Sequence, residues 1–291
     1  MGILIENPYL EPGAPWLKGN LHTHTKESDG TRPPQQIIDD YAARGYDFLM
    51  LSDHDKLTDP QRFESRGMLL VPGNEISASG PHLLHVNAKT LVASKDDRQT
   101  VIDAILADHA LAIVNHPNWE ENFNHCPQEN LNRWKGYAGI EVYNGVIRRL
   151  PGSPLASDRW DMLLAGGRRV WGFGNDDSHR AEEVALAWNV VQSKTRSVAA
   201  VCDAMARGSF YASTGVTIQS IAVQGRTIHL AAPNAQRIAV VTDFGVRRTH
   251  ADATEITFSV PDDADYHYVR LECFGRGEAM AWTQPFFLKR L

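Results

Sequence analysis

The amino-acid sequence predicts an α/β protein in which a barrel-like domain of alternating strands and helices precedes a small antiparallel β-domain. Up to residue 208, short apolar runs alternate with helical patterns about seven times, which favours a mostly parallel sheet with barrel-like closure. From about residue 212 only short strand patterns and turn residues remain, which is typical of a β-sandwich. We therefore expect a first domain at residues 1–211 and a second domain at residues 212–291.

Apolar spacing and helix-terminating residues define the elements of the first domain. In the first helix, prolines stand at the start, Ile37, Ile38 and Tyr41 recur at helical spacing, and Gly45 suits the end. Helical patterns cover residues 33–45, 96–110, 153–167 and 195–208. Strand patterns cover residues 48–54, 68–77, 82–88, 111–117, 139–145 and 169–179, after a short run at 18–21.

The second domain shows strand patterns and no helical pattern. They cover residues 216–223, 226–232, 236–243, 254–260, 266–273 and 281–288. About 80 residues are few for an independent hydrophobic core, so we expect this domain to pack on the first. Whether it binds substrate, pairs subunits or covers apolar surface stays open.

Composition excludes several classes of protein. The formal net charge is -6, so the chain has no global electrostatic reason to bind nucleic acid. No run approaches the roughly 20 apolar residues of a membrane helix, and the first residues lack a secretion-signal pattern. The three cysteines are separated and form no CxxC pair. We expect a cytoplasmic enzyme with no stable nucleic-acid partner and no membrane association, in an oligomeric state that stays open.

Histidines and carboxylates gather at strand ends, where parallel α/β barrels carry their chemistry. His22 and His24 are one residue apart, so they would leave a strand on the same face, although such a pair alone is weak evidence. His82 and His85 would point to opposite faces of their strand, and only one of them is expected to enter the site. The other strand-end candidates are Asp29, Asp53, His54, Glu75, His116, Asp177 and His179.

This set of ligands indicates a site with more than one metal ion. Imidazole and carboxylate together suit zinc, manganese or iron(II) better than calcium. More ligands than the usual four imply two or three divalent ions. The carboxylate of Glu75 suits a bridge between two ions, because each oxygen can bind one.

The segments HTHTKESDG, LSDHD, GNEIS, NHP and NDDSH resemble, in order, the motifs of the PHP (polymerase and histidinol phosphatase) superfamily. The resemblance implies a distorted seven-stranded β/α barrel, two or three divalent metals and hydrolysis of phosphate esters. It implies a first ion held by His22, His24, Glu75 and Asp177. It implies a second ion held by Glu75, His85 and His116, with His82 as a substitute for His85. It implies a third ion held by Asp29, His54 and His179, with Asp53 orienting a ligand.

The expected function is that of a metal-dependent phosphoesterase, a mono- or diesterase acting on a small or nucleotide-like phosphorylated substrate. A hydroxide that bridges two ions would attack phosphorus. The expected catalytic residues are Glu75, Asp177 and His179, and either His179 or a metal-bound water would protonate the leaving group. His82, Lys26 and Arg180 are candidate substrate contacts, and Arg148 and Arg149 are further candidates for a phosphate clamp.

Two other interpretations stay open. An amidohydrolase-like enzyme could apply the same metal chemistry to C–N or C–O bonds, because a fold does not fix its substrate. A non-catalytic ligand-binding protein could use the metals for stability alone, although structural metal sites are usually closed with four ligands.

Overall fold

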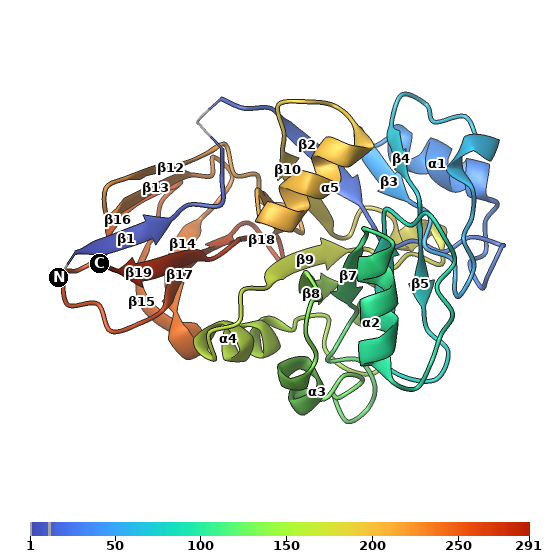
Figure 1. Ribbon diagram of the computed structural model, residues 1–291. Helices are drawn as coiled ribbons and strands as arrows, with labels where there is room; N and C mark the ends of the chain where they lie inside the picture. Colours follow the sequence, from blue (N-terminus) through green and yellow to red (C-terminus); the bar gives the residue numbers. More distant parts are fainter. Residues whose placement is uncertain (1, 11–12) are drawn as a thin grey trace.

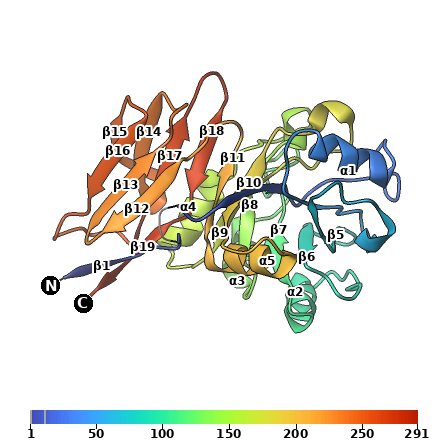
Figure 2. The same cartoon turned by 90° about the horizontal axis from the view of Figure 1, so that it is seen from above.

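The computed structural model describes residues 2–10 and 13–291 and shows a mixed α/β protein with many strands and few helices (Figure 1). One part carries the helices around its strands, and the other part is built of strands and includes the two terminal strands β1 and β19 (Figure 2). The helices are α1 Pro34–Ala42, α2 Arg98–Ala107, α3 Gln128–Arg133, α4 Ser157–Ala165 and α5 Val198–Arg207. Residues 1, 11 and 12 of the expected first domain lie outside the described residues.

The four predicted helices are confirmed, with shorter bounds than the patterns suggested. The end of α5 illustrates why: Gly208 adopts a left-handed conformation with φ of 79°, which glycine tolerates without strain. At its start, the Ser197 side chain accepts the N–H of Ala200 at 3.2 Å and so caps the helix. The short helix α3 was not predicted, because it contains a single buried residue, Leu131.

One sheet of the helix-bearing part follows chain order, β5–β6–β7–β8–β9. Its strands are β5 Gly73–Ile76, β6 Leu83–Val86, β7 Leu111–Val114, β8 Gly139–Asn144 and β9 Trp171–Asn175. The pairs β7–β8 and β8–β9 are parallel as predicted, whereas β5–β6 and β6–β7 are antiparallel. Residues 77–82 between β5 and β6 are too few for a parallel crossover, which needs about a dozen residues.

The remaining strands of this part belong to a larger sheet, in the order β11–β10–β2–β3–β4. They are β2 Trp16–Asn20, β3 Phe48–Met50, β4 Leu69–Val71, β10 Trp188–Gln192 and β11 Phe210–Ser213. The single strand predicted at 68–77 is divided between the two sheets at Pro72. Proline has no N–H to donate to a strand ladder, so it marks the point where the chain changes sheet.

The described strands do not form the closed barrel that the sequence predicts. The two sheets instead meet through isolated parallel bridges, one between Thr23 and Ser178 and the other between His54 and Glu75. Side chains from both sheets, among them Phe48 and Leu84, pack in one buried cluster between them. The bridges bring the ends of β2, β9, β3 and β5 together, and these ends carry the candidate ligands.

The strand-built part contains two antiparallel sheets that share one apolar core. The smaller sheet pairs β12 Ser220–Gln224, β13 Thr227–Ala231 and β16 Glu255–Ser259. The larger one contains β14 Arg237–Thr242, β15 Val246–Ala251, β17 Tyr268–Phe274, β18 Met280–Thr283 and β19 Phe286–Arg290. Strand β18 pairs with β11, so the sheet runs on into the helix-bearing part, and β1 Ile3–Glu6 pairs with β19.

The two parts are also joined by a buried polar network between α4 and β17. The Arg270 guanidinium donates to both carboxylate oxygens of Asp161, at 2.8 and 2.7 Å, and to Glu272 at 2.8 Å. The Tyr268 hydroxyl donates to the same Asp161 at 2.7 Å. In the part of the chain that the structure describes, no helix is long and apolar enough to cross a lipid bilayer.

Candidate metal centre

The first group of candidate ligands lies where β2 and β9 end. His22 and His24 flank Thr23, and Asp177 precedes Ser178, so the Thr23–Ser178 bridge sets the spacing between them. The Asp177 Oδ1 atom lies 3.2 Å from His22 Nε2 and 3.0 Å from His24 Nε2. All three side chains are almost completely buried. The HxH pair therefore does converge on one point together with Asp177.

Glu75, at the end of β5, is the centre of the second group. Its Oε1 atom lies 3.2 Å from His22 Nε2, 3.1 Å from His82 Nδ1 and 3.3 Å from His116 Nε2. Its Oε2 atom lies 2.9 Å from His54 Nδ1. A carboxylate with different histidines on its two oxygens has the arrangement that a ligand bridging two cations requires.

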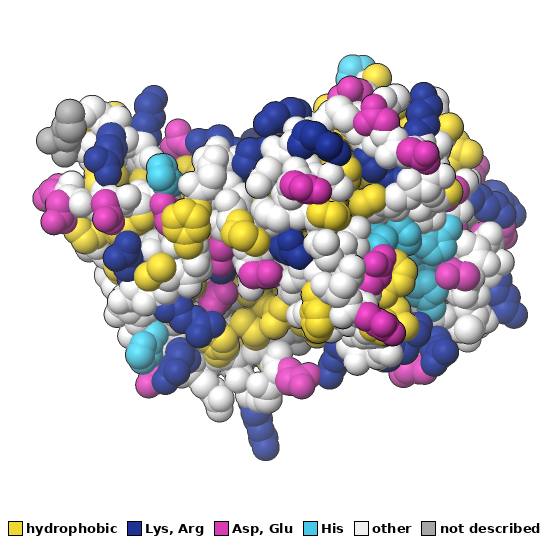
Figure 3. Space-filling model, turned by 90° about the horizontal axis from the view of Figure 1, so that it is seen from below, with side chains coloured by type: hydrophobic (Ala, Val, Ile, Leu, Met, Phe, Trp, Pro, Cys, Tyr) yellow, Lys and Arg dark blue, Asp and Glu magenta, His cyan; other side chains and the backbone are white. Residues whose placement is uncertain are grey.

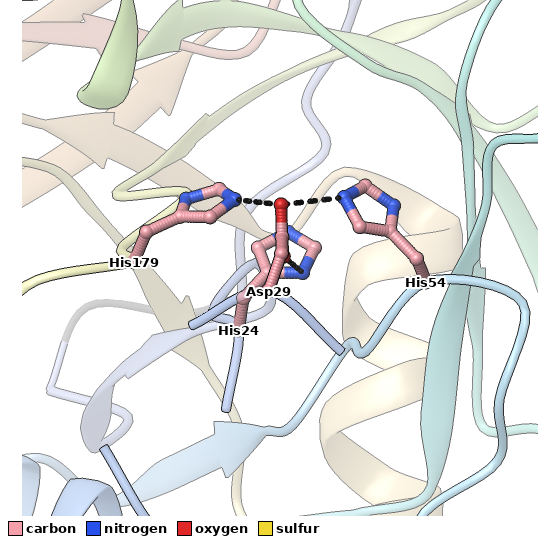
Figure 4. Close-up of side chains that lie close together, drawn as sticks. All are labelled: His24, Asp29, His54 and His179. Carbon is pink, nitrogen blue, oxygen red and sulfur yellow. Dashed lines mark ion pairs between the residues drawn. The ribbon is translucent and has the colours of Figure 1, made fainter. Parts of the chain in front are cut away.

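The third group surrounds Asp29, which lies between two imidazoles in Figure 4. Its Oδ2 atom is 3.3 Å from His179 Nε2 and 3.6 Å from His54 Nε2, and its Oδ1 atom is 3.7 Å from His24 Nδ1. The four ligand atoms of this group lie within 4.8 Å of one another. Asp29 is itself exposed, so this group is the one nearest to solvent.

The chemistry of the first group fits a cation. His22 Nε2, His24 Nε2 and Asp177 Oδ1 are buried and have no hydrogen-bond partner of acceptable geometry among the described residues. Buried polar atoms without partners are rare and costly, and a metal ion would satisfy all three. Asp177 and His116 also have positive φ angles of 54° and 26°, which is unusual for residues other than glycine and is found most often at functional sites.

The charges of the site are interdependent. Burial alone would raise the pKa of Glu75 and of Asp177, but the neighbouring histidines outweigh burial and hold both values below the ordinary range. Burial likewise opposes protonation of His54, yet the neighbouring carboxylates of Asp29 and Glu75 raise its pKa to about 10. The buried carboxylates thus remain anionic, and divalent cations could replace the protons that the histidines now share.

The structure separates the two histidines of the β6 segment, of which only one was expected in the site. His85, expected in the second group, lies within β6 and faces away, with Nε2 3.2 Å from Asp108 Oδ2. His82 precedes β6 and takes its place beside Glu75 and His116. The geometry therefore favours His82, the substitute that the sequence left open, over His85. Asp53 accepts hydrogen bonds from Thr25, Ser28 and Thr58, so it shapes the loop that carries Asp29.

Sequence reasoning missed Glu141, which orients two of the ligands. Its Oε1 atom lies 2.8 Å from His22 Nδ1, and its Oε2 atom accepts the backbone N–H of His116 at 2.9 Å. Asn144 and Asn175 donate to the same carboxylate. Glu141 lies in the fully buried strand β8, and a carboxylate inside an otherwise apolar run was the signal available in the sequence.

His125 was missed as well, because it lies in a loop without any motif. Its Nε2 atom accepts the backbone N–H of His82 at 3.1 Å, and its Nδ1 atom lies 2.9 Å from Glu120 Oε1. Burial, together with His116 and His82, lowers the pKa of His125 to about 2, so the ring is neutral. A neutral His125 can accept on one side and donate on the other, which fixes the position of His82.

A cavity of about 210 Å³ opens over the three groups. Figure 3 shows histidine side chains gathered on this face beside hydrophobic ones. The cavity is lined by Asp29, His54, Glu75, His82, His116, Trp119, Val146, Ile147, Arg149, Leu150, Asp177 and His179. Of the four basic residues considered as a phosphate clamp, Arg149 alone lines it, whereas Lys26, Arg148 and Arg180 are exposed elsewhere. The Arg149 Nε donates to Glu183, which anchors the guanidinium at the cavity.

A comparison with solved structures finds a protein of similar architecture. The chain superposes on a two-domain protein of Bacteroides vulgatus that is described as containing a predicted PHP-like metal-dependent phosphoesterase. The TM-score is 0.58 at 17% sequence identity, over 97% of this chain and 89% of that chain. This likeness shows that the two chains share a fold. No protein-family model and no curated protein matches the sequence.

Two further likenesses are partial. A candidate metal-dependent phosphoesterase of Bifidobacterium adolescentis is 16% identical with a TM-score of 0.43, over 56% of this chain and 88% of that chain. The lesion-specific endonuclease PfuEndoQ of Pyrococcus furiosus is 13% identical with a TM-score of 0.48, over 66% of this chain and 56% of that chain.

Proposed function

We propose that this protein is a metal-dependent hydrolase of phosphate esters that uses two or three divalent ions, of zinc, manganese or iron. The observation that carries the proposal is a single cavity that joins three overlapping ligand groups to an anchored arginine. A site built only for structural metals would not need an open cavity, and it would not need an arginine side chain beside the metal ligands. An arginine at a metal centre suits an anionic substrate such as a phosphate ester.

The proposed ligands divide into the three groups of the structure. His22, His24 and Asp177 would hold one ion, with Glu75 shared between it and a second. The second would also be held by His82 and His116, and the third by Asp29, His54 and His179, with His24 at its edge. When bound, such ions lower the pKa of water towards ~7 and stabilise the charge that gathers on phosphoryl oxygens.

The residues of the chain supply the rest of the chemistry. Arg149 would contact the phosphoryl oxygens and orient the ester. His179 lines the same cavity and is the group within reach for protonating the leaving oxygen when the third group holds no ion. Glu141 and His125 would act through the ligands, by fixing the rings of His22 and His82.

The size of the cavity supports a small substrate. At about 210 Å³ it lies below the range of roughly 300–1,000 Å³ usual for drug-sized ligands. Of the two expected substrate types, this favours the small phosphate ester over the nucleotide-like one, and it leaves both monoesters and diesters as candidates. We also infer that the helix-bearing part is a distorted barrel whose two sheets are joined by the isolated bridges, and that the strand-built part is a β-sandwich packed on it.

The test begins with the metal content of the purified chain and of a chelator-treated sample, each assayed on phosphate mono- and diesters. We expect activity that is lost on chelation and restored by zinc, manganese or iron(II). Glu75→Gln should lose both metal and activity, whereas the exposed His250→Ala, far from the cavity, should keep both. Full phosphatase activity without metal would contradict the proposal. Turnover of acyl esters or amides alone would favour the amidohydrolase-like alternative.

A further inference from the structure

One side of the cavity has no part in metal binding. It is formed by Trp119 and by the apolar residues of the segment 146–150, which are Val146, Ile147 and Leu150. Val146 and Ile147 are buried, while Trp119 and Leu150 are half-buried and so remain available to a ligand. Hydrophobic side chains that line a polar site mark a place where an apolar group of the substrate can be buried. We call these four residues the apolar wall.

Trp119 is held rigidly against the metal ligands. Its ring centroid lies 5.1 Å from that of His116 at an interplanar angle of 85°, and 4.8 Å from that of His125. The edge-to-face contact is a favoured aromatic geometry. The backbone N–H of Trp119 donates to the His116 carbonyl at 3.0 Å. The indole therefore keeps a fixed distance from the second ligand group.

The two segments of the apolar wall are joined to each other. Trp119 forms an isolated antiparallel bridge with Gly152, and the N–H of Glu120 donates to the Pro151 carbonyl at 3.0 Å. Gly152 has φ of 118°, and a Cβ there would lie 2.4 Å from the Asn118 carbonyl oxygen. Only glycine lets the two segments approach this closely. The chain thus builds one continuous wall from two segments that are separate in the sequence and adjacent in the fold.

We propose that the apolar wall selects phosphate esters whose alcohol group carries a single flat aromatic ring. The inference rests on the proposed function, because it assumes that the phosphoryl group lies at the metal centre beside Arg149. The ring would pack on Trp119 and on the aliphatic side chains of Ile147 and Leu150. A cavity of about 210 Å³ has room for one ring beside a phosphoryl group.

The test uses two phosphonates that are not hydrolysed, so the reactivity of a leaving group does not enter. Isothermal titration calorimetry of the metal-loaded protein would compare phenylphosphonate with methylphosphonate. We expect the phenyl compound to bind about tenfold more tightly, from aromatic packing. Trp119→Ala and Leu150→Ala should each lower the ratio of the phenylphosphonate affinity to the methylphosphonate affinity, while the affinity for methylphosphonate stays nearly unchanged. Trp119→Phe should retain most of this preference for the phenyl compound.

The matched control is Phe123→Ala, because Phe123 is an exposed aromatic residue in the same loop and does not line the cavity. It should leave both affinities unchanged. Metal analysis of each variant separates loss of the ring contact from loss of ligands. Equal affinities in the unmodified protein, or an equal loss of both in Trp119→Ala and Leu150→Ala with metal retained, would overturn the inference. If neither phosphonate binds the metal-loaded protein, the proposed function fails and the inference fails with it.

Discussion

His22 Nδ1 and Glu141 Oε1 lie 2.8 Å apart, in a pair that is completely buried. The Nδ1 contact leaves Nε2 of the same ring facing Asp177 and Glu75. The carboxylate also fixes the backbone of His116. A single side chain outside the ligand groups therefore orients ligands of two groups, which is the usual role of a carboxylate behind a metal-bound histidine.

Glu141→Gln should weaken metal binding without removing a ligand. The change keeps the shape of the side chain but replaces an anionic acceptor by a neutral amide, so we expect about a 10–100-fold loss of metal affinity. The measurement is a competition titration with a chelating indicator. Glu255→Gln on the exposed strand β16 is the matched control and should have no effect. Unchanged affinity in Glu141→Gln would show that Glu141 does not support the ligands.

His82 and His85 should respond differently to substitution. His82→Ala removes an imidazole beside Glu75 and His116, so we expect less bound metal per chain by elemental analysis. His85→Ala removes a buried partner of Asp108 and should lower the midpoint of thermal unfolding while the metal content stays the same. The reverse pattern, with metal lost only in His85→Ala, would restore the expectation based on the sequence.

Arg149→Met should separate substrate binding from metal binding. Loss of a charged hydrogen-bond donor to the phosphoryl group should lower kcat/KM for phosphate esters about 10–100-fold. Metal content should not change, because Arg149 contacts no ligand and is anchored by Glu183. Arg148→Met is the matched control. The Arg148 side chain pairs with the exposed Glu278 and does not line the cavity. Equal effects of the two substitutions would point to a general change of charge instead of a direct contact.

Strand-end motifs were enough to predict most of the candidate centre, because His22, His24 and Asp177 are each one residue from the bridge that brings their strands together. The choice between His82 and His85 could not be made, since alternation predicts opposite faces but does not say which face is inside. Glu141 and His125 act through long-range contacts, across 119 and 43 positions of the chain, and such contacts leave no local pattern.

The same reasoning explains the fold. Helices with a clear apolar face were predicted, whereas β15 was missed because nearly all of its residues are exposed and charged or polar. Strand β1 was missed because it is defined by pairing with β19 at the other end of the chain. Closure of the barrel was expected from the number of repeating units, but a proline between β4 and β5 interrupts the ladder.

The buried pair between Arg270 and Asp161 should contribute strongly to stability. Arg270→Met leaves Asp161 buried without its cation and leaves Glu272 with the exposed Arg247 alone, and breaking such a buried pair costs about 3–5 kcal/mol. Urea unfolding should show a clearly lower midpoint.

The comparable surface pair is Arg237 with Asp252, and Arg237→Met should cost at most about 1 kcal/mol because both side chains are exposed to water. If the two variants unfold at the same urea concentration, the network between α4 and β17 does not hold the two parts together. A double variant, Arg270→Met with Asp161→Leu, should recover part of the loss, because it also removes the uncompensated charge of Asp161.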